Sequence, residues 1–168
     1  STKWHPIYWA LIILINIVVF YPTLYHVARS DQVVYLANMV GSQSWIDLTW
    51  GNLSYDRVQH DFGQIDTLLF RPLFFIFLGT ELWLFKYNFF LWQLTGLLLH
   101  IATCLAFYHL LYRITPSFKA GLLTLFFSVL LITSEMVIWH HINGYLIFLF
   151  ILALLLREML EICQTKTF

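Results

Sequence analysis

Asp31 is the residue of this sequence with the clearest opportunity for acid–base chemistry. It lies in Arg29-Ser30-Asp31-Gln32, directly after an apolar run that ends near Val27. A carboxylate at the end of a membrane helix lies where water meets the bilayer. There it could accept a proton from an attacking hydroxyl group or hold a divalent cation. The alternative is an N-cap for a helix that begins near Val33, because aspartate is a preferred capping residue.

Arg71 is the candidate for phosphate binding, within Phe70-Arg71-Pro72-Leu73. Proline suits the first turn of a helix, and the planar guanidinium group of an adjacent arginine can hold two phosphate oxygens. An arginine whose side chain reaches from the membrane interface to water would occur in the same context. The sequence leaves both interpretations open.

Glu135, His140 and His141 lie close together at the end of another apolar run. Glu135 and Trp139 are four residues apart and would share one face of a helix. A carboxylate beside two imidazoles could bind a metal ion or position a substrate. The alternative is an interfacial belt with Trp139 and the histidines at head-group level, although Glu135 needs a partner at that depth.

His100 lies near the middle of an apolar run, nine residues before His109. Polar groups at membrane depth usually face a partner or a cavity. A neutral imidazole could bind a metal, haem or chlorophyll. A hydrogen bond to a neighbouring helix is the simpler explanation for either histidine.

The composition indicates that membrane helices carry these residues. Of the 168 residues, 60% are apolar, 19% are aromatic and 11% are charged, whereas soluble domains are about 45–50% apolar and about 25% charged. Nine basic residues balance nine acidic ones, which excludes a basic surface for nucleic acid. The two cysteines predict no disulfide framework. We therefore predict an integral membrane protein.

Four apolar segments are long enough to span the membrane, since about 20 residues cross about 30 Å of hydrocarbon. We predict spans at about residues 7–27, 91–112, 120–139 and 144–160. The segment 68–86 is interpreted as an interfacial helix. If it lies along the surface, one side of the membrane holds five cations, which satisfies the positive-inside bias: Lys3, Arg113, Lys119, Arg157 and Lys166.

The prediction is an all-α, polytopic transmembrane helix bundle that forms a single domain over residues 1–168, with both termini cytoplasmic. The segment 28–67 becomes one long external loop, rich in aspartate and aromatic residues. His140 and His141 lie in a second, very short external segment. The acidic and imidazole groups therefore gather on one face of the membrane, which is the main indication of function.

The order of these features resembles the N-terminal part of GT-C superfamily glycosyltransferases, which are polytopic enzymes that use lipid-phosphate-linked sugars. The protein O-mannosyltransferase-like and bacterial lipid-glycosylating branches look most similar. Three segments carry the resemblance: Ser30-Asp31-Gln32 matches the catalytic-aspartate segment, Phe70-Arg71-Pro72-Leu73 is similar to Tyr-Arg-Pro-Leu, and Glu135-Met136-Val137-Ile138-Trp139 is similar to Glu-x-Val-x-Trp.

The sequence also departs from the family pattern. His100 alone survives from the family's His, Asn and His on the second span, with Gln93 and Gly96 at the other two places. Leu130 and Leu131 stand where the family has His-Pro. Such enzymes commonly have ten or more spans, so the resemblance covers about their first third.

The resemblance implies transfer of a sugar from a polyprenyl-phosphate donor to an extracytoplasmic acceptor. Asp31 would be the catalytic base and Arg71 would bind the donor phosphate. The remaining groups would bind or orient substrate, with a divalent cation as the candidate cofactor: Glu135, His140, His141 and His100. The expected location is a bacterial inner membrane or an ER-type membrane, where membrane lipid and other membrane subunits are the expected partners.

Two further functions remain open. The chain could be a non-catalytic helical subunit of a larger respiratory or photosynthetic membrane complex, derived from such a transferase. The departures from the family pattern favour this alternative. A cytochrome-like bundle that uses His100 and His109 as cofactor ligands is the third.

Overall fold

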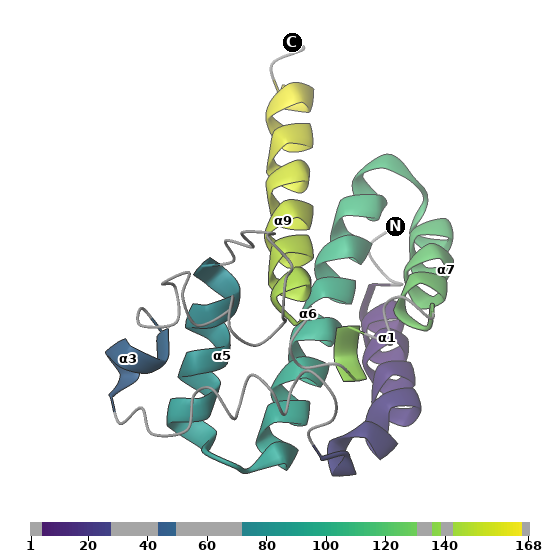
Figure 1. The fold of residues 1–168 in the computed structure, drawn as a ribbon. Coiled ribbons are helices and arrows are strands. Elements are labelled where there is room, and N and C mark those ends of the chain that lie inside the picture. Colours follow the sequence, from purple (N-terminus) through teal and green to yellow (C-terminus); the bar gives the residue numbers. More distant parts are fainter. Residues whose placement is uncertain (1–4, 28–43, 50–71, 131–135, 139–142, 166–168) are drawn as a thin grey trace, which may run out of the picture.

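A computed structural model of the chain describes residues 5–27, 44–49, 72–130, 136–138 and 143–165. Every regular element in these ranges is a helix, and no strand occurs among them, so the prediction of an all-α fold is confirmed there (Figure 1). The elements are α1 (His5–Phe20), η2 (Tyr21–Tyr25), α3 (Trp45–Thr49), α5 (Pro72–Phe85), α6 (Phe89–Ile114), α7 (Ser117–Ser128) and α9 (Gly144–Thr165).

Two helical segments are long and apolar enough to cross a membrane. They are His5–Tyr25, with 21 residues, and Phe89–Ile114, with 26 residues. Both lie where the sequence predicts spans, at 7–27 and 91–112. Helix α9 has 22 residues, but Arg157, Glu158 and Glu161 fall in its second half. The predicted span at 144–160 therefore coincides with a helix, while its crossing of the membrane stays a prediction.

The first of these segments changes its helical type at Pro22. Proline has no N–H to donate and its ring crowds the preceding turn, so α1 continues as the tighter 3-10 helix η2. The Thr23 hydroxyl donates to the Phe20 carbonyl at 2.7 Å. This backbone carbonyl therefore has a side-chain hydrogen-bond donor at the point where the helical type changes. The segment ends at His26, which has an extended backbone.

A tight turn at Lys86 joins α5 to α6. The Lys86 N–H donates to the Leu82 carbonyl at 2.9 Å, and the Trp92 indole donates to the Lys86 carbonyl at 3.1 Å. Because of this turn, α5 runs beside α6 in the opposite direction (Figure 1). The predicted helix within 68–86 is thus present, and its position in the membrane interface stays a prediction.

Replacing Lys86 with glycine is expected to stabilise the fold. Lys86 has a φ of 51°, and this left-handed conformation costs a non-glycine residue about 1–2 kcal/mol. Glycine removes this cost, but its greater freedom in the unfolded chain lowers the unfolding free energy by about 0.5–1 kcal/mol. We expect Lys86→Gly to raise the unfolding free energy by up to about 1 kcal/mol in thermal or denaturant unfolding. Lys86→Ala keeps the strain and should give no gain; an equal gain from both variants would contradict the explanation.

Helix α7 ends earlier than the sequence predicts. A continuous helix would use the Ser128 carbonyl for a backbone N–H four residues later. Here the His100 ring nitrogen Nε2 contacts that carbonyl oxygen at 3.0 Å, and the Val129 N–H turns back to the carbonyls of Phe126 and Phe127. Within the segment 120–139, α7 therefore stops at Ser128 and residues 136–138 are helical again, while the span predicted at 120–139 stays a prediction.

Helix α6 lies at the centre of the bundle, and α1 packs against it in the opposite direction. The His5 ring lies 4.1 Å from the Tyr112 ring, near the end of α6. At the other end, the ring of Tyr25 lies 6.3 Å from that of Phe90. We call the end with Tyr25 and the α5–α6 turn the η2 end, and the end with His5 and Tyr112 the terminal end.

Helix α9 packs on α6 in the same direction. The Thr103 hydroxyl lies 3.2 Å from the Leu146 carbonyl oxygen, and farther along both helices Arg113 forms an ion pair with Glu161 at 3.0 Å. Both α6 and α9 therefore run towards the terminal end, as Figure 1 shows. Residues 136–138 lie between α7 and α9 in the sequence, and Val137 packs in one cluster with Leu97 and Ile101 of α6.

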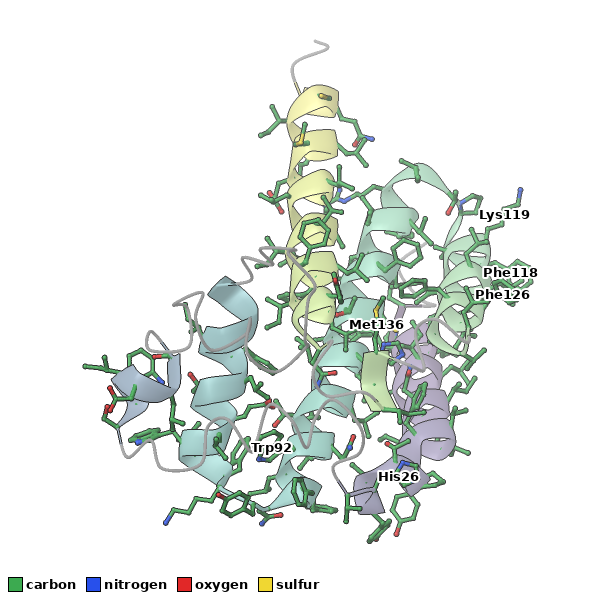
Figure 2. All side chains as sticks on the ribbon, in the orientation of Figure 1. His26, Trp92, Phe118, Lys119, Phe126 and Met136 are labelled. Atoms are coloured by element: carbon green, nitrogen blue, oxygen red, sulfur yellow. The ribbon has the colours of Figure 1, made fainter. Side chains whose placement is uncertain are left out.

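The outer faces of the bundle are strongly apolar. Phe118 and Phe126 project from α7 away from the other helices (Figure 2), and Phe126 is 65% exposed. On α1, Val18 is 66% exposed. Soluble monomers rarely leave large apolar patches uncovered, so these faces have the character of surfaces that contact lipid or other helices.

Candidate functional site

His100 is the one residue of the predicted site that lies within the described part of the chain. The other five fall outside the described residues: Asp31, Arg71, Glu135, His140 and His141. The catalytic and binding roles assigned to them therefore stay predictions. The described helices still show where the chain enters and leaves the segments that contain these residues.

The interior of the bundle surrounds His100 completely. Its side chain is 0% exposed. Because a carbonyl oxygen only accepts hydrogen bonds, Nε2 must donate to the Ser128 carbonyl. The edge of the ring meets the Phe20 ring, with 5.3 Å between centroids and an interplanar angle of 84°. This is the hydrogen bond between helices that the sequence offered as the simpler explanation, and it favours a packing role over substrate binding.

His109 has different surroundings from His100. Its ring packs edge-on against Trp9 of α1, with 5.2 Å between centroids. Among the described residues, no group of three or more His, Cys, Asp or Glu side chains could hold a metal ion. Ligands for the predicted divalent cation would therefore have to include residues of the other segments.

The η2 end brings together two parts of the chain that border predicted catalytic residues. Val137 is 0% exposed and packs in one core cluster with Phe20, Leu24, Leu97 and Ile101. Leu24 precedes Asp31 by seven residues, and Val137 follows Glu135 by two. The chain next to Glu135 therefore contacts the same end of the bundle from which the chain continues towards Asp31.

Three buried polar residues near this end were not among the predicted site residues. Glu81 and Gln93 are each 3% exposed and Asn143 is 0% exposed. Gly96 makes room for Asn143: a Cβ atom there would lie 2.8 Å from the Asn143 amide nitrogen. A carboxylate inside an apolar helix is expensive to bury, and that signal could have identified Glu81 within the segment 68–86, which was interpreted as an interfacial helix.

The terminal end has a different chemistry. Arg113 of α6 pairs with Glu161 of α9 at 3.0 Å, and Arg157 lies 3.7 Å from the same carboxylate. These side chains are partly exposed, so each pair stabilises the fold by about 0–1 kcal/mol. The cluster links the last turns of two helices, and it lies at the opposite end of α6 from Val137.

Neither a protein-family model, nor a curated protein, nor a solved structure matches this chain. The resemblance to GT-C glycosyltransferases therefore depends on the motifs and on their order along the chain. A functional assignment has to combine that order with the geometry of the η2 end.

Proposed function

We propose that this chain is a membrane glycosyltransferase whose motif order resembles the N-terminal part of GT-C enzymes, and that it moves a sugar from a polyprenyl-phosphate donor to an extracytoplasmic acceptor. The packing of Val137 in one core cluster with Phe20 and Leu24 carries the proposal. Because of this cluster, described residues that lie close in sequence to Asp31 and to Glu135 share one region of the bundle. A shared region is the minimum that a common catalytic site requires.

The chemistry assigns a separate task to each group. Asp31 removes the proton from the acceptor hydroxyl group, and the oxygen of that hydroxyl group bonds to the anomeric carbon. The bond from that carbon to the lipid phosphate breaks, and polyprenyl phosphate leaves with the electron pair. Arg71 stabilises the charge on the leaving phosphate, and a bound divalent cation would supply further positive charge there. The imidazoles of His140 and His141, with Glu135, orient the substrates.

The distribution of cations supports an external position for the η2 end. Arg113, Lys119 and Arg157 belong to the part of the fold around the terminal end, while Lys86 lies in the α5–α6 turn at the η2 end. Cytoplasmic segments of membrane proteins are enriched in lysine and arginine. This bias favours termini in the cytoplasm and catalytic groups outside, in a bacterial inner membrane or an ER-type membrane.

A donor-consumption assay tests the proposal directly. The chain is reconstituted in lipid vesicles with a radiolabelled polyprenyl-phosphate sugar and a membrane extract as the source of acceptor. We expect release of polyprenyl phosphate above that of protein-free vesicles. Chelation of divalent cations should lower the release at least tenfold, since a metal Lewis acid contributes several kcal/mol, and added Mg²⁺ or Mn²⁺ should restore it. No release from any donor tested would contradict the proposal.

A second candidate is a non-catalytic helical subunit of a larger respiratory or photosynthetic membrane complex. The observations that favour it are the exposed apolar faces of α1, α7 and α9 and the use of His100 in packing. Interfaces between membrane helices form mainly by van der Waals contact and by hydrogen bonds. The native mass of the gently solubilised protein separates the candidates: a stoichiometric companion without donor release would favour the subunit.

A further inference from the structure

Residues of α1, α6 and α7 meet at two successive levels inside the bundle. Nearer the η2 end, the His100 ring contacts Phe20 and the Ser128 carbonyl. Nearer the terminal end, Ile12, Cys104 and Ala120 form one buried cluster. Each level contains residues from all three helices, so the two levels fix the alignment of the three helices.

Polar residues lie between these levels on α1 and α7, next to His100 and Cys104 of α6. Asn16 lies midway between Ile12 and Phe20 on α1, and Thr124 lies midway between Ala120 and Ser128 on α7. Both side chains are 0% exposed. On α6 the Cys104 sulfur lies 3.7 Å from His100 Nε2, and both side chains are 0% exposed. We call Asn16, His100, Cys104 and Thr124 the polar layer.

Three atoms of the polar layer have no hydrogen-bond partner within the described part of the chain. They are Asn16 Oδ1, His100 Nδ1 and Thr124 Oγ1, and all three are buried. The Asn16 amide nitrogen is occupied, because it donates to the Ile12 carbonyl at 2.8 Å. Buried polar groups are nearly always hydrogen-bonded to protein or to ordered water. Three such atoms at one level therefore point to a shared ligand.

The donor and acceptor properties of these atoms select the ligand. Asn16 Oδ1 accepts. His100 Nδ1 also accepts, because Nε2 carries the hydrogen of the neutral ring. The Thr124 hydroxyl can donate. A ligand that donates twice and accepts once matches this set, and water has that capacity within the volume of a single small molecule.

We propose that the polar layer binds one water molecule, which donates to Asn16 Oδ1 and His100 Nδ1 and accepts from the Thr124 hydroxyl. This water connects α1, α6 and α7. It also holds His100 in the form with hydrogen on Nε2, and that hydrogen occupies the Ser128 carbonyl at the end of α7. The site thus couples the helix contacts to the break after α7, independently of the catalytic proposal.

A double-mutant cycle tests the bridge. Asn16→Leu and Thr124→Val each remove one polar partner with little change in volume, so each should lower the melting temperature. The double variant should lose clearly less melting temperature than the two single variants lose together, because either substitution alone already releases the water. The matched control is Thr103→Val on α6. The Thr103 hydroxyl donates to the Leu99 and Leu146 carbonyls and lies outside the polar layer. The loss of melting temperature in Thr103→Val should therefore add fully to the loss in Asn16→Leu. Full additivity of Asn16→Leu with Thr124→Val would overturn the proposal.

Solid-state NMR of the histidine-labelled wild-type chain in lipid bilayers gives a second readout that needs no destabilised variant. Magnetisation should pass from water to the His100 ring, whose signal is identified by its loss in His100→Gln. No transfer to that ring would overturn the proposal. One zinc or copper ion per chain, removed by chelation together with a shift of the His100 signal, would assign the site to a metal and would overturn it equally.

Discussion

Replacing Asp31 with asparagine is expected to lower the rate of sugar transfer at least hundredfold. A positioned general base contributes about 10²- to 10⁴-fold to the rate, and an amide cannot take the proton. The substitution also separates the two interpretations of Asp31, because asparagine is as good an N-cap as aspartate. If Asp31 only caps a helix, both the folded protein and its transfer rate should survive the change.

Asp47→Asn is the matched control for this experiment. It makes the same chemical change within the same predicted external loop. Asp47 accepts a hydrogen bond from the Ser44 hydroxyl at 2.7 Å at the start of α3, which gives it a structural role. We expect Asp47→Asn to retain most of the transfer rate. Full transfer by Asp31→Asn, in an assay where the wild type is active, would contradict the catalytic role.

Gly121→Ala is expected to lower the unfolding free energy by about 1–3 kcal/mol, the usual cost of overpacking. Its Cβ atom would lie 2.6 Å from Cε1 and 3.0 Å from Cγ of the Tyr8 ring, so α1 and α7 would have to separate or the ring would have to move. Helix propensity alone predicts the opposite sign, because alanine in a helix is favoured over glycine by about 0.5–1 kcal/mol. The sign of the change therefore reports on the contact.

The Tyr8→Ala background supplies the control for Gly121→Ala. Alanine lacks every Tyr8 ring atom that the added methyl group would meet, so the same substitution should be neutral or stabilising there. Thermal unfolding of the four proteins in one detergent gives the comparison. Stabilisation by Gly121→Ala in both backgrounds would show that α1 does not pack on α7 as described.

The sequence predicted helices well where a long apolar run was the only signal. Segments 7–27 and 91–112 coincide with helices because an apolar run of that length can satisfy its backbone only as a helix in a membrane. The run at 120–139 gave the same signal, but α7 stops at Ser128. His100 hydrogen-bonds the Ser128 carbonyl at this point, and no local pattern shows that residues 28 positions apart will meet.

Less of the candidate site than of the fold could be predicted from the sequence. For His100 the sequence left metal binding and helix packing open, since an imidazole in an apolar run fits both. Its partner, the Ser128 carbonyl, is a backbone atom and leaves no trace in the sequence. Asn143 is buried against Gly96, which leaves space for its side chain, and this is a property of packing between elements. The polar layer likewise depends on the alignment of three helices.

Labelling of cysteines from the two sides of the membrane tests the central claim most directly. Gln32→Cys and His141→Cys, each in a Cys163→Ser background, report on the segments that contain Asp31 and the paired histidines. The native Cys163 is exposed and reports on the terminal end, whereas Cys104 is buried. An impermeant maleimide added outside intact cells should react at positions 32 and 141, and with Cys163 only after permeabilisation. Reaction of positions 32 and 141 from opposite sides would contradict a shared site.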